Sequence, residues 1–144
     1  MTAPIGVSLG LIRRGQRISQ QTMADHLGVA VCTVGSWDRG HRSPPIGSAV
    51  AYAAWLDRRL VLLQGSAVVA EGEDIIVDLA KLRRGQGVSR PRLAHRLFMT
   101  TAGVRSYEVQ ICSGSRLDGL QRYVEALGYH IGIAALAKQL QEVS

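Results

Sequence analysis

The side chains that could do chemistry in this chain are hydrogen-bonding groups and arginines gathered in two places. The first group contains Gln20, Thr33, Ser36, Arg39 and Arg42, and a second group follows about 70 residues later. A guanidinium forms paired hydrogen bonds with planar or anionic acceptors, while a short hydroxyl makes single or water-bridged bonds. The chemistry that these residue types offer is therefore recognition by charge and hydrogen bonding.

The sequence offers no comparable signal for catalysis. It contains no paired carboxylates, nucleophile elbow or phosphate-binding loop, so we expect no enzyme activity and no cofactor. The two cysteines, Cys32 and Cys112, have no Cys or His nearby at metal-ligand spacing, so no metal site is expected and both are expected to be reduced thiols. No small-molecule ligand is evident either.

Two short helices around a tight turn must position the first group of residues. Ser19 is suited to cap a helix over 20–27, and Gly28 is suited to a backbone position with positive φ. A second helix over 30–39 would place Val34 and Trp37 on its inner face. Its outer face is then small and polar, which suits insertion into the major groove of DNA.

This stretch resembles the helix-turn-helix domains of the lambdoid phage repressor and Cro superfamily, also called the xenobiotic-response-element family. The shared pattern is read in Ile18-Ser19-Gln20, Ala24, Leu27-Gly28-Val29, Val34, Trp37 and Asp38-Arg39-Gly40, with the basic turn His41-Arg42-Ser43-Pro44 after it. The resemblance covers most of residues 7–57. It implies a fold of short helices that binds double-stranded DNA.

The chain also repeats itself at a spacing of 70 residues. Twelve of the 34 positions from 5 to 38 are identical to the residue 70 positions later, among them the run 13–16, which returns at 83–86. After one extra residue in the second copy the spacing becomes 71, so that Tyr52 matches Tyr123. Self-similarity at a fixed period predicts two copies of one structural unit.

The second copy departs from the family pattern at several positions. Phe98 stands in place of Gly28, so we expect its turn to be built differently, and Arg90 stands in place of Gln20. Thr100 is a better cap for the next helix than Ala30. We expect the second copy to share the fold, while base reading by it stays open.

The resemblance also implies which residues would touch DNA. Gln20 and its counterpart Arg90 would contact phosphate at a helix N-terminus, and Arg39, His41 and Arg42 would contact the backbone beside the groove. Val31, Cys32, Thr33 and Ser36 would face the bases in the first copy, and Thr101, Ala102, Arg105 and Ser106 would do so in the second. Arg105 is the one long donor on these two faces and is the candidate for guanine.

The charge is divided unevenly along the 144 residues, whose net charge is +6. Residues 1–64 carry +4, residues 65–74 carry −3 and residues 75–144 carry +5. We therefore expect a family-like domain over 1–64, an acidic connector or hairpin over 65–74, and a divergent second domain over 75–144. No apolar run long enough to span a membrane and no signal peptide is recognised, so we expect a cytoplasmic protein of a bacterium or phage-infected cell.

The expected fold class is mainly α, with tandem repressor-like domains and a small β element. Helices are predicted near 7–14, 20–27, 30–39, 46–56, 76–84, 90–97, 101–109 and 117–127, with a final helix over 134–142. Apolar runs at 59–63 and 67–70 predict a hairpin, and 130–133 is the matching strand of the second copy. If 59–63 and 130–133 pair within one chain, the molecule is a monomeric pseudo-dimer.

The function predicted from these features is sequence-specific binding of double-stranded DNA by a transcriptional regulator. A phage-type repressor that occludes a promoter fits best, bound as a monomer to an asymmetric operator. The alternative is an antitoxin that neutralises a toxin partner and regulates its own promoter. A tight copurifying partner would favour the antitoxin.

Overall fold

The computed structural model describes residues 3–136, which form a mainly helical protein with one small antiparallel sheet. In the first part of the chain the helices are α1 (Ile5–Gly15), α2 (Gln20–Leu27), α3 (Val31–Asp38) and α4 (Ile46–Trp55). The strands β1 (Arg58–Gln64) and β2 (Ala67–Glu71) and a 3-10 turn, η1 (Gly72–Ile76), follow. The rest comprises α5 (Leu79–Gly85), α6 (Arg90–Leu97), α7 (Thr101–Gln110), α8 (Leu117–Ala126) and β3 (His130–Ala135).

The sheet joins segments that are far apart in the sequence. Its strand order is β2-β1-β3, and the central strand β1 pairs antiparallel with both neighbours. Leu60 pairs with Ile133 and Leu62 with Ile131, so the predicted pairing of 59–63 with 130–133 is confirmed, and the predicted hairpin with 67–70 is present as well. Leu60, Val61 and Leu62 of β1 are buried, and Leu60 and Leu62 belong to the hydrophobic core.

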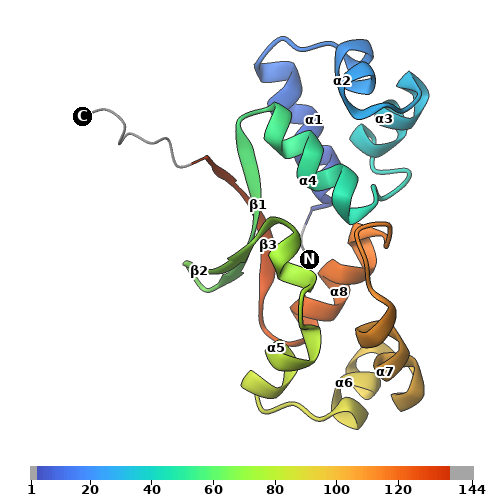
Figure 1. Cartoon of the computed structure of the whole chain (residues 1–144), viewed down its shortest axis with the longest axis vertical. Helices are drawn as coiled ribbons and strands as arrows, with labels where there is room; N and C mark the ends of the chain where they lie inside the picture. Colours follow the sequence, from blue (N-terminus) through green and yellow to red (C-terminus); the bar gives the residue numbers. More distant parts are fainter. Residues whose placement is uncertain (1–2, 137–144) are drawn as a thin grey trace.

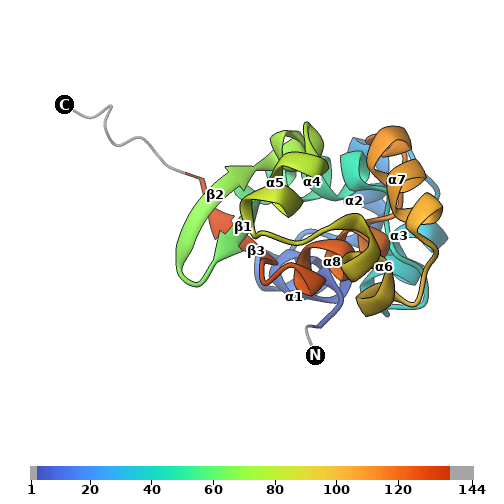
Figure 2. The same ribbon diagram turned by 90° about the horizontal axis from the view of Figure 1, so that it is seen from below.

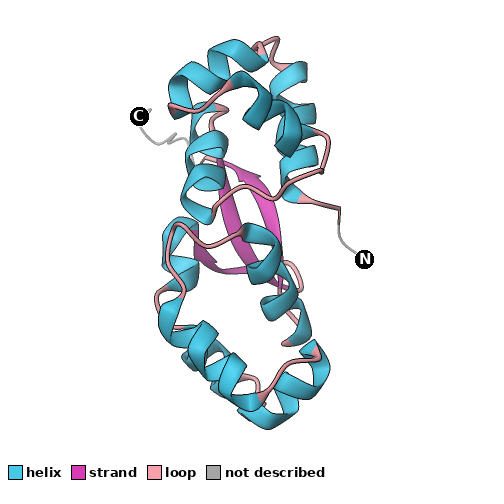
Figure 3. Ribbon diagram, turned by 90° about the vertical axis from the view of Figure 1, so that its right-hand side faces the viewer, coloured by secondary structure: helices cyan, strands magenta, loops and turns pink. Residues whose placement is uncertain are grey.

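The two halves of the chain occupy the two ends of the molecule, with the sheet on one side between them (Figure 1). Helices α1–α4 lie at one end and α5–α8 at the other, and α3 and α7 both lie on the side away from the sheet (Figures 1 and 2). The view from that side shows the helices in front and the strands behind them (Figure 3).

A continuous hydrophobic core links the halves. It includes Leu9, Met23 and Tyr52 from the first half, Tyr123 from the second, and Leu62 of the sheet. Because β3 completes a sheet whose central strand belongs to the first half, the predicted segments 1–64 and 75–144 share one core and one sheet.

Most predicted helices agree with the structure to within two residues at each end, and two of them differ by more at their starts. The helix expected from about residue 76 begins at Leu79, because η1 occupies 72–76 and the carboxylate of Asp78 accepts a hydrogen bond from the Lys81 amide, 3.0 Å away, as a helix cap. The helix expected over 134–142 is wrong at its start, since Ala134 and Ala135 continue β3 opposite Arg59 and Arg58. Its remainder, from residue 137 on, lies outside the described residues. None of the described helices is long and apolar enough to cross a membrane.

Candidate nucleic-acid interface

Local capping fixes α2 and the turn that follows it. The Ser19 hydroxyl accepts a hydrogen bond from the Thr22 amide, 3.0 Å away, as predicted. Gly28 has φ of +68°, and the Val29 amide reaches back to the Ala24 carbonyl at 3.1 Å. The chain therefore reverses direction within a few residues and starts α3 at Val31.

The corresponding turn after α6 has the same geometry, so the expectation that Phe98 requires a different turn is wrong. Phe98 adopts the left-handed conformation with φ of +55°, and the Met99 amide donates to the Ala94 carbonyl at 2.9 Å. The Phe98 side chain is 95% exposed, so it meets no steric obstacle beyond its own backbone. Left-handed geometry costs a non-glycine residue about 1–2 kcal/mol, which the surrounding structure offsets.

The helices α3 and α7 begin differently. Ala30 offers α3 no side-chain cap, whereas the Thr100 hydroxyl accepts from the Gly103 amide at 2.9 Å. The prediction that Thr100 is the better cap is confirmed.

A buried ionic network holds α3 against α1 and α4. Arg13 on α1 donates to the carboxylate of Asp38 on α3 at 3.0 Å, and the hydroxyl of Tyr52 on α4 donates to the same carboxylate at 2.7 Å. Burial, and then the neighbouring Asp38 carboxylate, raise the pKa of the Tyr52 hydroxyl well above its ordinary range. The network fixes the end of α3 from which the loop at 39–45 departs.

The second half holds α7 in a matching way. Arg83 on α5 donates to Glu108 on α7 at 2.7 Å, and Tyr123 on α8 donates to the same carboxylate. Burial alone would raise the pKa of Glu108, but hydrogen bonds from Arg83, Tyr123 and Arg90 keep it below its ordinary value.

The structure places most of the predicted contact residues on the surface. The exposed ones are Val31, Cys32, Arg39, His41 and Arg42 in the first half and Thr101, Ala102, Arg105 and Ser106 in the second. Thr33 and Ser36 are half-buried. In both halves these residues lie on or directly after the two helices turned away from the sheet (Figure 1).

The two residues predicted to bind phosphate from the first turn of a helix are already engaged inside the protein. The Gln20 amide donates to Asp38 at 3.3 Å, and the Arg90 guanidinium pairs through Nε with Glu108 at 3.0 Å. Their side chains thus extend the ionic networks. A phosphate at these helix ends would therefore accept hydrogen bonds from backbone amides in place of these side chains.

A groove at the junction of the two halves contains residues that the sequence did not single out. Its volume is about 680 Å³, and Thr33, His41 and Arg42 line it together with Arg116 and Asp118 of the second half. The pairing of Pro45 with Arg116 brings the two loops together, and this contact is non-local, so neither helical periodicity nor the repeat indicated it. We call this feature the junction groove.

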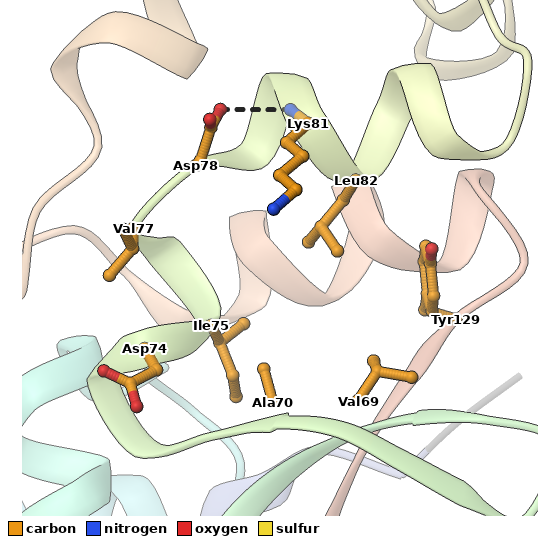
Figure 4. A pocket seen from close by; sticks show the side chains of 9 residues that line it. All are labelled: Val69, Ala70, Asp74, Ile75, Val77, Asp78, Lys81, Leu82 and Tyr129. Atoms are coloured by element: carbon orange, nitrogen blue, oxygen red, sulfur yellow. Dashed lines mark hydrogen bonds between the residues drawn. The ribbon is translucent and has the colours of Figure 1, made fainter.

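A second cavity, of about 410 Å³, lies between β2, η1 and α5 (Figure 4). Ile75, Leu82 and Tyr129 supply much of its wall, and the Lys81 side chain points toward the first two. None of the predicted contact residues lines it.

Comparison with known proteins adds no assignment to this geometry. No protein-family model, no curated protein and no solved structure matches the chain.

Proposed function

We propose that this protein is a transcriptional regulator that binds double-stranded DNA sequence-specifically through two helix-turn-helix units in one chain. In this proposal α2 and α3 form one unit, α6 and α7 form the other, and the protein acts as a phage-type repressor in the cytoplasm. The observation that carries it is the placement of α3 and α7, which both lie on the side of the molecule away from the sheet (Figures 1 and 2) and both carry exposed residues. The arginine surplus of both halves supports a polyanionic partner.

The matching hydrogen bonds support the interpretation of the halves as two copies of one unit. Gln16 donates to the Leu56 carbonyl and Gln86 to the Leu127 carbonyl, each at 2.9 Å. These partners are separated by the same shifts of 70 and 71 residues that relate the two ionic networks. Hydrogen bonds that recur at equivalent positions are a more specific sign of repetition than apolar residues that recur.

The two recognition faces differ, which favours an asymmetric operator. The face of α3 presents Val31 and Cys32, suited to contact thymine methyl groups, whereas α7 presents Arg105, suited to guanine. A symmetric dimer reads one half-site twice, but unlike faces within one chain require unlike half-sites. The shared sheet would hold the two readers at a fixed separation.

Selection from randomised duplexes, followed by footprinting and a binding stoichiometry, tests this proposal. We expect one chain to protect one asymmetric site with half-sites about one helical turn apart. Absence of any preferred duplex would overturn it. A palindrome occupied by two chains would reject the monomeric mode, and a copurifying toxin whose activity is neutralised would favour the antitoxin.

A further inference from the structure

The junction groove is lined by residues of both halves, next to the bridge between Pro45 and Arg116. Thr33 belongs both to the predicted reading face of α3 and to the groove wall. Arg116 and Asp118, at the start of α8, line the same groove from the second half. The groove is therefore continuous with the proposed interface.

Backbone contacts between the halves make the groove a preformed feature. The Ile46 amide donates to the Ser115 carbonyl at 2.8 Å, and the Leu117 amide donates to the Pro44 carbonyl at 2.9 Å. The Ser43 hydroxyl accepts from the Asp118 amide at 2.8 Å. A ligand bound there would not need to order these loops first.

The groove carries an excess of cationic groups with one carboxylate among them. Arg42 is exposed, and within residues 3–136 its side chain has no ion-pair partner. Arg116 forms a two-point contact with Asp118, at 3.2 and 2.9 Å, although the two side chains are 73% and 47% exposed. An exposed ion pair of this kind contributes little stability, so a competing anion can displace it.

We propose that the junction groove holds a DNA backbone phosphate between the two half-sites, with Arg42 and Arg116 as its ligands. In this arrangement Asp118 competes with the phosphate for Arg116 and so weakens the contact. The proposal rests on the DNA-binding function proposed above and adds an attachment point outside both reading helices. It makes Arg116 a contact to the DNA backbone, which carries affinity but no base information.

The test compares Asp118→Asn with Asp74→Asn, because both raise the net charge by one. Asp74 lies on η1 and lines the other cavity, so it serves as the matched control for long-range charge. Binding to the selected operator is measured from low to high salt. We expect Asp118→Asn to bind roughly two- to fivefold more tightly than the control, the range that an exposed ion pair supports. Arg116→Gln should make the log–log salt slope shallower by about 0.9.

Two further measurements localise the effect. In an Arg116→Gln background, Asp118→Asn should no longer tighten binding beyond the control, because Asp118 then has no Arg116 guanidinium to withhold from the phosphate. Replacing single phosphates between the half-sites by neutral methylphosphonates should remove the Asp118→Asn gain at one position. Thermal unfolding of each variant checks that the fold is intact.

Equal behaviour of the Asp118→Asn and Asp74→Asn proteins on DNA would overturn the proposal while leaving DNA binding in place. A gain that is erased only by methylphosphonates inside a half-site would also overturn it. Binding of inorganic phosphate that depends on Arg116, with an unchanged DNA salt slope, would assign the groove to a small anion instead. If the unmodified protein binds no duplex specifically, that result contradicts the proposed function itself.

Discussion

At the scale of single residues, the buried arginines depend strongly on a charged partner for their stability in the core. Arg13 is only 4% exposed and meets Asp38 and Tyr52 inside the core. Removing one member of a buried pair leaves the other charge without compensation. The adjacent Arg14 is exposed and gives a matched comparison.

We expect Arg13→Met to lower the free energy of unfolding by about 3–5 kcal/mol, because the Asp38 carboxylate stays buried without its cation. Arg14→Met should change it by less than about 0.5 kcal/mol. Urea unfolding of the three proteins measures both values. Equal losses would show that the pair adds nothing beyond its apolar contacts.

The second network predicts a pH effect with a defined sign. The pKa of Glu108 is lowered in the folded protein, although burial opposes this, because Arg83, Tyr123 and Arg90 bind its charged form. Its stabilising contribution is therefore complete above the unfolded value of about 4.3 and is lost as the pH falls through the lower folded value.

We accordingly expect the difference in unfolding free energy between the parent and Glu108→Gln to shrink as the pH is lowered below about 4.3. Urea titrations at a series of pH values measure it. A difference that grows on acidification would mean that the folded pKa is raised.

Base reading is also decided at the residue scale. Arg105→Ala should cost about 1–3 kcal/mol of binding and relax the preference at one half-site only. Arg42→Ala should weaken binding to all duplexes evenly, because phosphate carries no sequence information directly. Competition assays with operators mutated in one half-site separate the two patterns. A neutral Arg105→Ala would show that α7 does not read bases.

At the scale of elements, the sequence predicted those helices whose caps and apolar faces are set by neighbouring residues. The ranges of α2 and α6 were predicted correctly because Ser19 and Ser89 cap them and an apolar face runs along each helix. The start of the helix expected over 134–142 was predicted wrongly, because the sequence shows the helical spacing of Leu136 and Leu140, while Ala134 and Ala135 are held in β3 by their register with β1. Contacts between distant segments, such as those of the junction groove, leave no periodic signal in the sequence.

The turn at Phe98 gives a test at this scale. Phe98→Asn should raise the free energy of unfolding by up to about 1 kcal/mol, because Asn tolerates the left-handed region and an exposed ring loses no packing. Gly28→Ala should lower it by about 1 kcal/mol for the opposite reason. Thermal or urea unfolding checks both. A destabilised Phe98→Asn would reveal that the ring does make a stabilising contact.

At the scale of the whole molecule, the proposed binding mode predicts a strong dependence on salt. If two basic halves together neutralise roughly six phosphates, the slope of log affinity against log salt should be near −5. Titrations of the selected operator between low and moderate salt measure it. A slope near zero would contradict an electrostatic footprint over both halves.

The order of strands in the sheet also sets the order of events during synthesis. Leu60 and Leu62 of β1 leave the ribosome well before their partners Ile133 and Ile131 exist. At about 5–20 residues per second, the 66 residues from Gly65 to His130 require roughly 3–13 seconds. Throughout that interval the nascent chain has a central strand with one unsatisfied edge, which is open to wrong partners. The arrangement that holds the two ends of the finished molecule together thus leaves the growing chain with an open strand edge until β3 is made.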